Sequence, residues 1–395
     1  MCTLRTLLVG AVAFSSFAGT ARADILFEET NLVSDGSVPA VITDHNFLNP
    51  WGVSEGPNTP FWVSVNGSGV SNIYAVPGSS NTLVEQKPLV VTIPPASGMS
   101  GDMSAPTGQI FNGTLSNATP GFNLSNGKPA VFLFGSEDGG ISGWNGGTAA
   151  ELPINNSAQE AVYKGLAIDD AAGSLFAANF HSGQVEMYNS SFGLMKTFTD
   201  PNLPTGYAPF NLSVINDKLY VTFALQNADK EDDVAGLGHG FVDVFDLNGA
   251  NPTRLISNGQ LDSPWGLQIA PASFGTLAGD LLVGNFGNGR INAYDATTGA
   301  FEGALLGKDG KPLSITDLWA LTIGNGAGGG DPNTLYFTAG LEDEGHGLFG
   351  SLTPVNTPEP STWALMTLGF AGLALANYRR DRRARVAPTF EPTTG

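Results

Sequence analysis

Hydrophobic and polar residues follow one recurring order through the middle of the chain. An apolar strand and a loop lead to a second apolar strand ending in Asn. A Gly turn then leads to an alternating strand ending in Tyr. The order is clearest in three stretches, 50–74, 164–188 and 264–294. Alternation with a period of two is typical of strands in a sheet, so each stretch predicts a small antiparallel sheet.

Weaker copies of the pattern fill the gaps between these stretches. The six units begin near residues 51, 107, 165, 209, 265 and 319. Units of roughly 55 residues with about four short strands each are typical of propeller blades. We therefore predict an all-β protein, a six-bladed β-propeller over residues 24–356. Strand 25–33 is expected to close the ring by pairing with the last blade. Two β-sandwich domains, the other fold considered, do not explain the repeat.

The first 23 residues have the pattern of a secretory signal peptide. Residues 7–18 are apolar, and Ala21 and Ala23 form an A-x-A cleavage site for signal peptidase. The only cysteine, Cys2, lies in this segment. The mature chain is therefore expected to have no disulfide, and catalysis or metal binding by cysteine is excluded.

A second apolar segment lies near the C-terminus. Residues 361–378 carry no charge and are followed by an arginine cluster at 379–385. A helix of this length spans about 27 Å, close to the thickness of the bilayer core. We therefore expect a single transmembrane helix over 361–378, with the arginines on the cytoplasmic side. Residues 386–395 are expected to form a disordered tail.

The sequence around this segment resembles a known sorting signal. The motif Pro358-Glu359-Pro360, the apolar helix and the pair Arg379-Arg380 resemble the PEP-CTERM signal of Gram-negative bacteria, here over 357–385. In that family an exosortase recognises the Pro-Glu-Pro motif and cleaves near it. The resemblance implies an exported protein that is anchored transiently in the inner membrane. It would then pass to the outer envelope or extracellular matrix.

The central repeat resembles NHL-type propellers. Stretches 31–35, 49–52 and 238–245 also resemble an uncharacterised bacterial family of secreted propellers. This resemblance implies a fold and leaves the activity open.

The net negative charge of the chain limits the classes of ligand that it can bind. The chain has a formal net charge of −19, and residues 24–356 hold 10 Lys and Arg against 33 Asp and Glu. Nucleic acid is excluded as a partner because phosphate binding needs basic patches. An acidic surface could attract divalent cations, and the acidic insertion at 226–233 is a conceivable calcium site. The spacing of an EF-hand is absent there, and a solvated acidic loop is the favoured interpretation.

Histidines provide the candidate chemistry for an enzyme. His181, His239 and His346 lie in loops that could converge near the central opening, where Glu342 or Glu344 could join them around a transition metal. This predicts a metal-dependent lyase or hydrolase. The other interpretation is that each histidine hydrogen-bonds a carbonyl beside Gly-rich backbone.

Polar residues also recur at related blade positions. They are Asn66, Glu137, Asn179 and Asn285, with Asn211 in an earlier strand. They could form a ring that faces a ligand. Asn also tolerates the left-handed backbone region and is common in turns, which is the favoured interpretation. Trp51, Trp265 and Trp319 share one repeat position, and packing between blades explains them better than sugar stacking.

No P-loop or HExxH zinc motif occurs in the sequence. We therefore predict a non-catalytic binding or matrix module for exopolysaccharide, peptide or an envelope protein. The metal-dependent enzyme and a purely structural matrix protein remain the alternatives.

Overall fold

The computed structural model describes residues 25–80, 82–96, 102–355 and 360–384. Ile25–Val355 form one compact unit, and helix α1 (Pro360–Ala384) belongs to a second. The predicted signal peptide (1–23), Pro358, Glu359 and the tail (386–395) lie outside the described residues.

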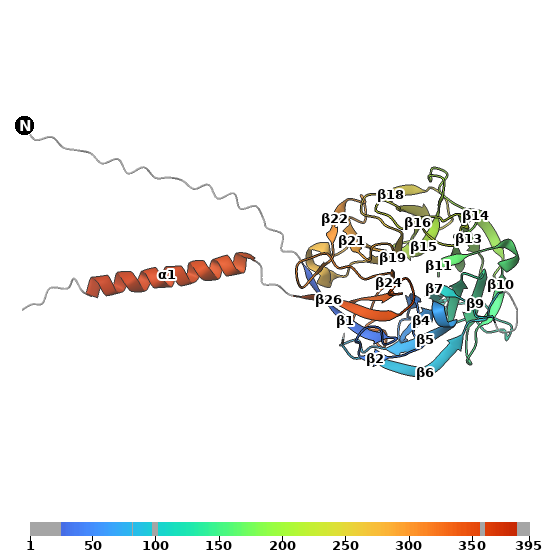
Figure 1. Cartoon of the computed structure of the whole chain (residues 1–395), viewed down its shortest axis with the longest axis horizontal. Helices are drawn as coiled ribbons and strands as arrows, with labels where there is room; N and C mark the ends of the chain where they lie inside the picture. The colour runs from blue at the N-terminus through green and yellow to red at the C-terminus, as the bar shows by residue number, and fades with distance from the viewer. Residues whose placement is uncertain (1–24, 81, 97–101, 356–359, 385–395) are drawn as a thin grey trace, which may run out of the picture. The chain divides into compact units, whose positions relative to one another are not determined.

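In the described residues, five four-stranded antiparallel sheets and one six-stranded sheet surround a common axis, which confirms the predicted six-bladed propeller (Figure 1). In each of the first five blades the strands follow one another in sequence from the axis outward. These blades are β3–β6 (Pro50–Ser54, Phe61–Val65, Val70–Ala75, Glu85–Thr92), β7–β10 (Pro106–Phe111, Phe132–Ser136, Gly140–Trp144, Glu151–Asn155), β11–β14 (Tyr163–Asp169, Ser174–Asn179, Gln184–Tyr188, Leu194–Phe198), β15–β18 (Tyr207–Ile215, Lys218–Leu225, Phe241–Asp246, Thr253–Ser257) and β19–β22 (Pro264–Ile269, Leu281–Asn285, Ile291–Tyr294, Phe301–Ala304).

The sixth blade joins the two ends of the propeller. Strands β24 (Leu318–Ile323), β25 (Leu335–Ala339) and β26 (Leu348–Val355) come from the end of the repeat, and β1 (Leu26–Ser34) is the outer strand. β1 pairs antiparallel with β26, as predicted for the closing strand. Short strands β2 (Ile42–Thr43) and β23 (Leu306–Gly307) pair with β1. The ring is thus closed by backbone hydrogen bonds between distant parts of the sequence.

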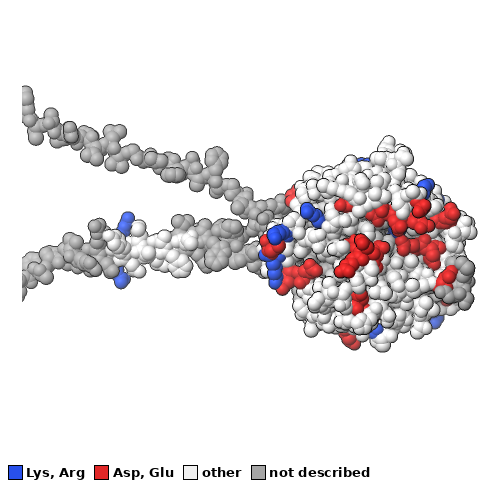
Figure 2. Space-filling view, in the orientation of Figure 1, with Lys and Arg blue, Asp and Glu red and all other residues white. Residues whose placement is uncertain are grey.

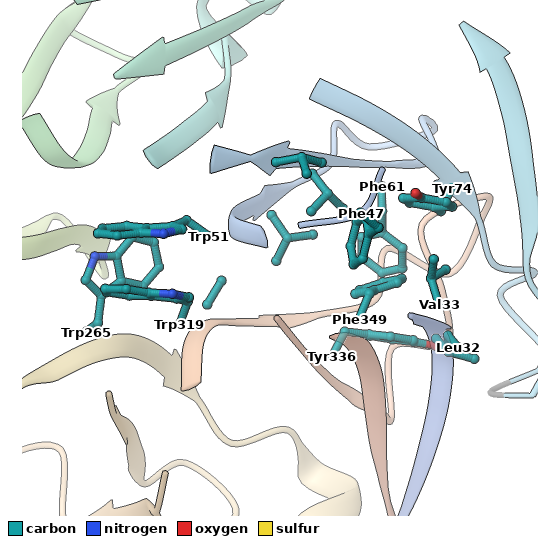
Figure 3. Close-up of a cluster of buried hydrophobic side chains, with 14 of the residues drawn as sticks. Leu32, Val33, Phe47, Trp51, Phe61, Tyr74, Trp265, Trp319, Tyr336 and Phe349 are labelled. Carbon is teal, nitrogen blue, oxygen red and sulfur yellow. The ribbon is translucent and has the colours of Figure 1, made fainter. Parts of the chain in front are cut away.

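Hydrophobic residues fill every space between neighbouring blades. The buried side chains form six clusters, one at each blade-to-blade contact. Both faces of each sheet are covered in this way, which explains why the second strand of each blade is almost entirely buried. The contact between blades 6 and 1 holds Phe61, Tyr74, Tyr336 and Phe349 (Figure 3).

Each innermost strand departs from regular pairing near its start. The register shifts between Pro50 and Val53 in the first blade, and at the corresponding place in the other five. Such bulges re-aim a side chain. Just after the bulged residue the inner strands lie very close together. A Cβ on Gly52 would lie 2.6 Å from the Thr107 carbonyl oxygen, so glycine is required there.

The C-terminal segment forms the helix α1 that the sequence predicts for 361–378. Among the described residues, however, no helix is long and apolar enough to cross a membrane. The transmembrane helix expected over 361–378 is therefore not borne out.

Candidate functional site

The bulged position contributes one residue from each blade to the centre of the propeller. These residues are Trp51, Thr107, Lys164, Phe210, Trp265 and Trp319. The Trp51 and Trp319 rings stack with centroids 3.4 Å apart, and Trp265 meets Trp319 edge-on at 5.8 Å (Figure 3). The three indoles are buried. They therefore pack together at the axis and close the centre of the channel, rather than presenting a stacking surface for sugars.

Lys164 is the charged member of this ring. Its side chain is 2% exposed, and its ammonium donates to Glu137 and lies 3.5 Å from Asp232 Oδ1. The ammonium also lies 5.0 Å from the centroid of the Trp51 ring, a cation–π contact. Burial acts to lower the pKa of Lys164, but the nearby carboxylates outweigh burial and raise it. The ammonium consequently stays protonated at neutral pH.

Polar side chains from four loops surround Lys164 on one face of the propeller. Asn66 Nδ2 donates to Glu137 Oε2 at 2.8 Å, and Asn49 hydrogen-bonds both Asn66 and Glu344. We call this group the axial mouth; it consists of Asn49, Asn66, Glu137, Lys164, Asp232 and Glu344. Asn66, Glu137, Asp232 and Glu344 lie in the loops between the second and third strands of blades 1, 2, 4 and 6. Equivalent loops meet at one face of a propeller, so residues far apart in sequence come together.

Carboxylates at the axial mouth outnumber the single positive charge. Burial, together with repulsion from Glu137, raises the pKa of Glu344 to about 7. Burial also raises the pKa of the neighbouring Asp233 to about 6, and Asp233 Oδ2 has no hydrogen-bond partner in the described structure. The mouth therefore holds negative charge that Lys164 neutralises only in part.

The loop that carries Glu344 has an unusual backbone. Glu342, Asp343 and Glu344 have φ values of 56°, 54° and 64°, so three consecutive residues adopt the left-handed region. For residues other than glycine this costs on the order of 1–2 kcal/mol each. Such strain often accompanies functional loops.

The polar residues predicted to face a ligand divide into two groups. Asn66 and Glu137 come together at the axial mouth. Asn179 instead donates to the buried Glu186 at 2.7 Å, and Asn285 donates to the Gln260 carbonyl at 2.7 Å. Asn211 lies inside the channel, where its Nδ2 donates to the Trp265 carbonyl at 2.8 Å. These three side chains hold backbone and strands in place, and none of the three residues adopts the left-handed backbone region considered for them.

The three candidate histidines contact different neighbouring residues. His181 Nε2 lies 3.6 Å from Glu160, and His239 Nδ1 lies 2.8 Å from the Val234 carbonyl. His346 Nδ1 lies 2.6 Å from Asp35, whose hydrogen bond raises the pKa of His346. His346 Nε2 lies 3.6 Å from Glu342.

No group of three or more His, Asp or Glu among the described residues is arranged to hold a metal ion. In the described residues His181, His239 and His346 thus do not gather into one group with Glu342 or Glu344, and no such group is found at 226–233. The histidines bind different neighbours in blades 3, 4 and 6, and Asp232 of the insertion turns toward Lys164. Glu344 also belongs to the mouth and not to a histidine cluster.

Sequence reasoning missed Lys164, Asp232, Asp233 and Asn49 as parts of the site. A signal for Lys164 exists, because it is the one charged residue at a repeat position otherwise held by Trp, Phe or Thr. Asp232 and Asp233 lie in an insertion outside the repeat, so the pattern could not place them.

Comparisons with known proteins bear on both units of the chain. Residues 356–380 match the PEP-CTERM protein-sorting motif. This confirms the resemblance at the C-terminus, and the motif implies an exported protein that exosortase sorts to the cell surface.

The propeller has solved structural neighbours at low identity. A luciferin-regenerating enzyme is 14% identical with a TM-score of 0.47, and the match covers 78% of this chain and 92% of that one. Virginiamycin B lyase from Staphylococcus aureus is 11% identical with a TM-score of 0.46, and the match covers 84% and 100%. At these identities the likeness concerns the fold alone.

Two uncharacterised proteins of Acanthamoeba polyphaga mimivirus are more similar in sequence. Each is 30% identical to this chain, over 346 and 355 residues, and each match covers 85% of this chain. The matches cover 82% and 87% of the two relatives. The chain therefore belongs to the family of these two uncharacterised proteins, and within it carries a PEP-CTERM sorting motif at its C-terminus.

Proposed function

We propose that the exported propeller is a non-catalytic binding module of the outer envelope or extracellular matrix, and that its axial mouth binds cationic groups of a peptide or protein. The observation that carries this proposal is the excess of carboxylates around the single buried ammonium of Lys164.

Charge complementarity favours a cationic ligand over a neutral one. Glu344 and Asp233 have raised pKa values because they lie in a partly desolvated, negative environment. A ligand ammonium or guanidinium would relieve this repulsion and form charge-assisted hydrogen bonds. Asp and Glu side chains also gather over the propeller face seen in Figure 2, which would steer a cationic ligand toward the protein.

The chemistry of Lys164 supports binding rather than catalysis. A lysine acts as nucleophile or base only when its amine is neutral, which requires a lowered pKa. The carboxylates around Lys164 raise its pKa instead. The same side chain supplies the positive charge that a metal ion would bring to a carboxylate cluster.

Calorimetric titration of the full-length chain with matched peptides tests this proposal. We use three peptides of equal length that differ only in carrying two Arg, two Gln or two Glu. The Arg peptide is expected to bind, and its affinity should fall steeply as salt rises from 50 to 500 mM. Glu344→Gln should weaken binding of the Arg peptide about three- to tenfold, whereas Glu85→Gln on an exposed outer strand should leave it unchanged.

Equal binding of the three peptides would remove the proposal. Binding of acidic or neutral exopolysaccharide with no affinity for the Arg peptide would assign the module to glycans. A blank result with every ligand would favour the purely structural matrix protein. Turnover on a hydrolase and lyase panel would show that the module is catalytic.

A further inference from the structure

A cavity lies in the channel on the other side of the tryptophans from the axial mouth. It has a volume of about 370 Å³ and is lined by the inner strands of all six blades. Trp265 lies at one end of the lining, and residues from the far ends of the strands, including Glu55, Asp170 and Thr322, lie at the other. A cavity of this size is within the usual range for small-molecule sites.

The charges on this cavity have one sign. Its titratable lining residues are Glu55 and Asp170, and the described residues that line it include no Lys, Arg or His. The remaining polar lining groups include Ser213 and Gln268. Gln268 Oε1 accepts from the Ile269 amide at 3.0 Å, which turns the oxygen toward the strand.

Glu55 is the unusual group in the cavity wall. Its Oε1 accepts a hydrogen bond of 3.2 Å from Thr322 Oγ1, while Oε2 is shielded from solvent and has no hydrogen-bond partner in the described structure. A carboxylate with one neutral donor and no cation in such a place is costly. Burial accordingly raises the pKa of Glu55 to about 8. Tyr336 of β25 is the titratable group that faces it, and burial raises the pKa of Tyr336 to about 12, so this phenol stays neutral.

We propose that this cavity binds a small organic ammonium ion, such as an aliphatic diamine, with Glu55 as its counter-ion. On binding, the Glu55 carboxyl group releases its proton to solvent and the resulting carboxylate pairs with the ammonium, which keeps its own protons. The pairing oxygen is Oε1, which lies against Thr322 of the cavity lining, because Oε2 is shielded. The site is independent of the axial mouth, because the tryptophans lie between the two and no residue is shared. A cation is preferred over a neutral molecule because both ionisable lining groups are acids.

The test is calorimetric titration of the full-length chain with 1,4-diaminobutane, in buffers of different ionisation enthalpy. One saturable site is expected. At pH 7 binding should release protons, and the number released should fall as the pH approaches and passes the pKa of the free carboxyl group, which burial raises to about 8. The neutral analogue 1,4-butanediol should not bind.

Glu55→Gln keeps the shape of the side chain but cannot become an anion. It is expected to lower diamine affinity at least tenfold and to abolish proton release, while Glu85→Gln changes neither. Absence of diamine binding, binding without proton release, or equal binding of the diol would each overturn the proposal. The proton-release measurement needs no variant, so the test stands even if Glu55→Gln fails to fold.

Discussion

At the scale of single residues, one substitution in a repeat creates the candidate site. The bulged position holds Trp in three blades, where indoles pack at the axis, and Lys164 in the third blade. The sequence predicted correctly that the tryptophans pack rather than bind sugar. The sequence did not predict Lys164 as part of a site, because Glu137, Asp232 and Glu344 reach this lysine from loops of three other blades.

Removing the Lys164 charge should destabilise the propeller. Lys164→Met keeps an unbranched side chain that is one atom shorter and leaves the mouth carboxylates without their cation. Breaking a buried ion pair costs about 3–5 kcal/mol, and partial exposure of Glu137 places the expected loss near the lower end. The free energy of unfolding of the variant, obtained from urea denaturation, measures this loss.

Lys87→Met is the matched control, because Lys87 pairs with the exposed Glu85. This change should lower the free energy of unfolding by about 1 kcal/mol or less. Equal losses for the two variants would show that Lys164 contributes no more than a surface lysine.

Stability should fall as pH rises from about 4.5 to 8. Glu55 and Glu344 have folded-state pKa values of about 8 and 7, above the ordinary value of 4.5. Between these values the folded protein binds more protons than the unfolded chain, so raising pH favours unfolding. Urea unfolding across this window measures the slope.

Glu55→Gln should flatten the pH slope, and Glu85→Gln should not. Stability that is constant or rises across the window would contradict the assignment of buried neutral carboxyl groups.

At the scale of secondary-structure elements, the repeat made the strands predictable. The six predicted starting points coincide with the six inner strands, and the closing role of residues 25–33 is confirmed by the pairing of β1 with β26. The loops were not predictable in the same way. Asn66 and Asn179 end equivalent strands, yet Asn66 reaches Glu137 in the next blade whereas Asn179 bonds Glu186 in its own.

Closure of the ring by β1 can be tested with Phe27. This residue is buried, and its ring meets Phe274 with centroids 4.8 Å apart. Phe27→Ala should lower the free energy of unfolding by about 3–5 kcal/mol. The control is Phe301→Ala, because Phe301 on outer strand β22 is 49% exposed. This change should lower the free energy of unfolding far less. Similar losses of unfolding free energy in the two variants would show that β1 contributes little to the stability of the ring.

The sorting motif gives a prediction for the C-terminal segment. The change of Pro358 and Pro360 together to Ala should abolish exosortase processing, since both lie in the matched motif. Immunoblots of cell fractions would show the chain at its larger, unprocessed size.

Pro388→Ala, outside the matched residues, should be processed normally. Normal processing of the double variant would show that the motif does not act as a sorting signal in this chain.

At the scale of the whole molecule, the propeller has an acidic face at the axial mouth, and tryptophans close the channel beneath it. Loops from different blades bring several carboxylates to one face, and the tryptophans separate that face from the cavity lined by Glu55. The fold could be read from periodicity because blades repeat. The site could not, because it depends on residues that differ from blade to blade and on an insertion that breaks the repeat.

The central claim is that the axial mouth binds a cationic ligand. Hydrogen exchange of the full-length chain, with and without the Arg peptide, tests it most directly. We predict slower exchange in loops 137–139, 226–233 and 342–346, and no such change in the Glu344→Gln variant at the same peptide concentration. Protection confined to other surfaces, or equal protection by the Glu peptide, would contradict it.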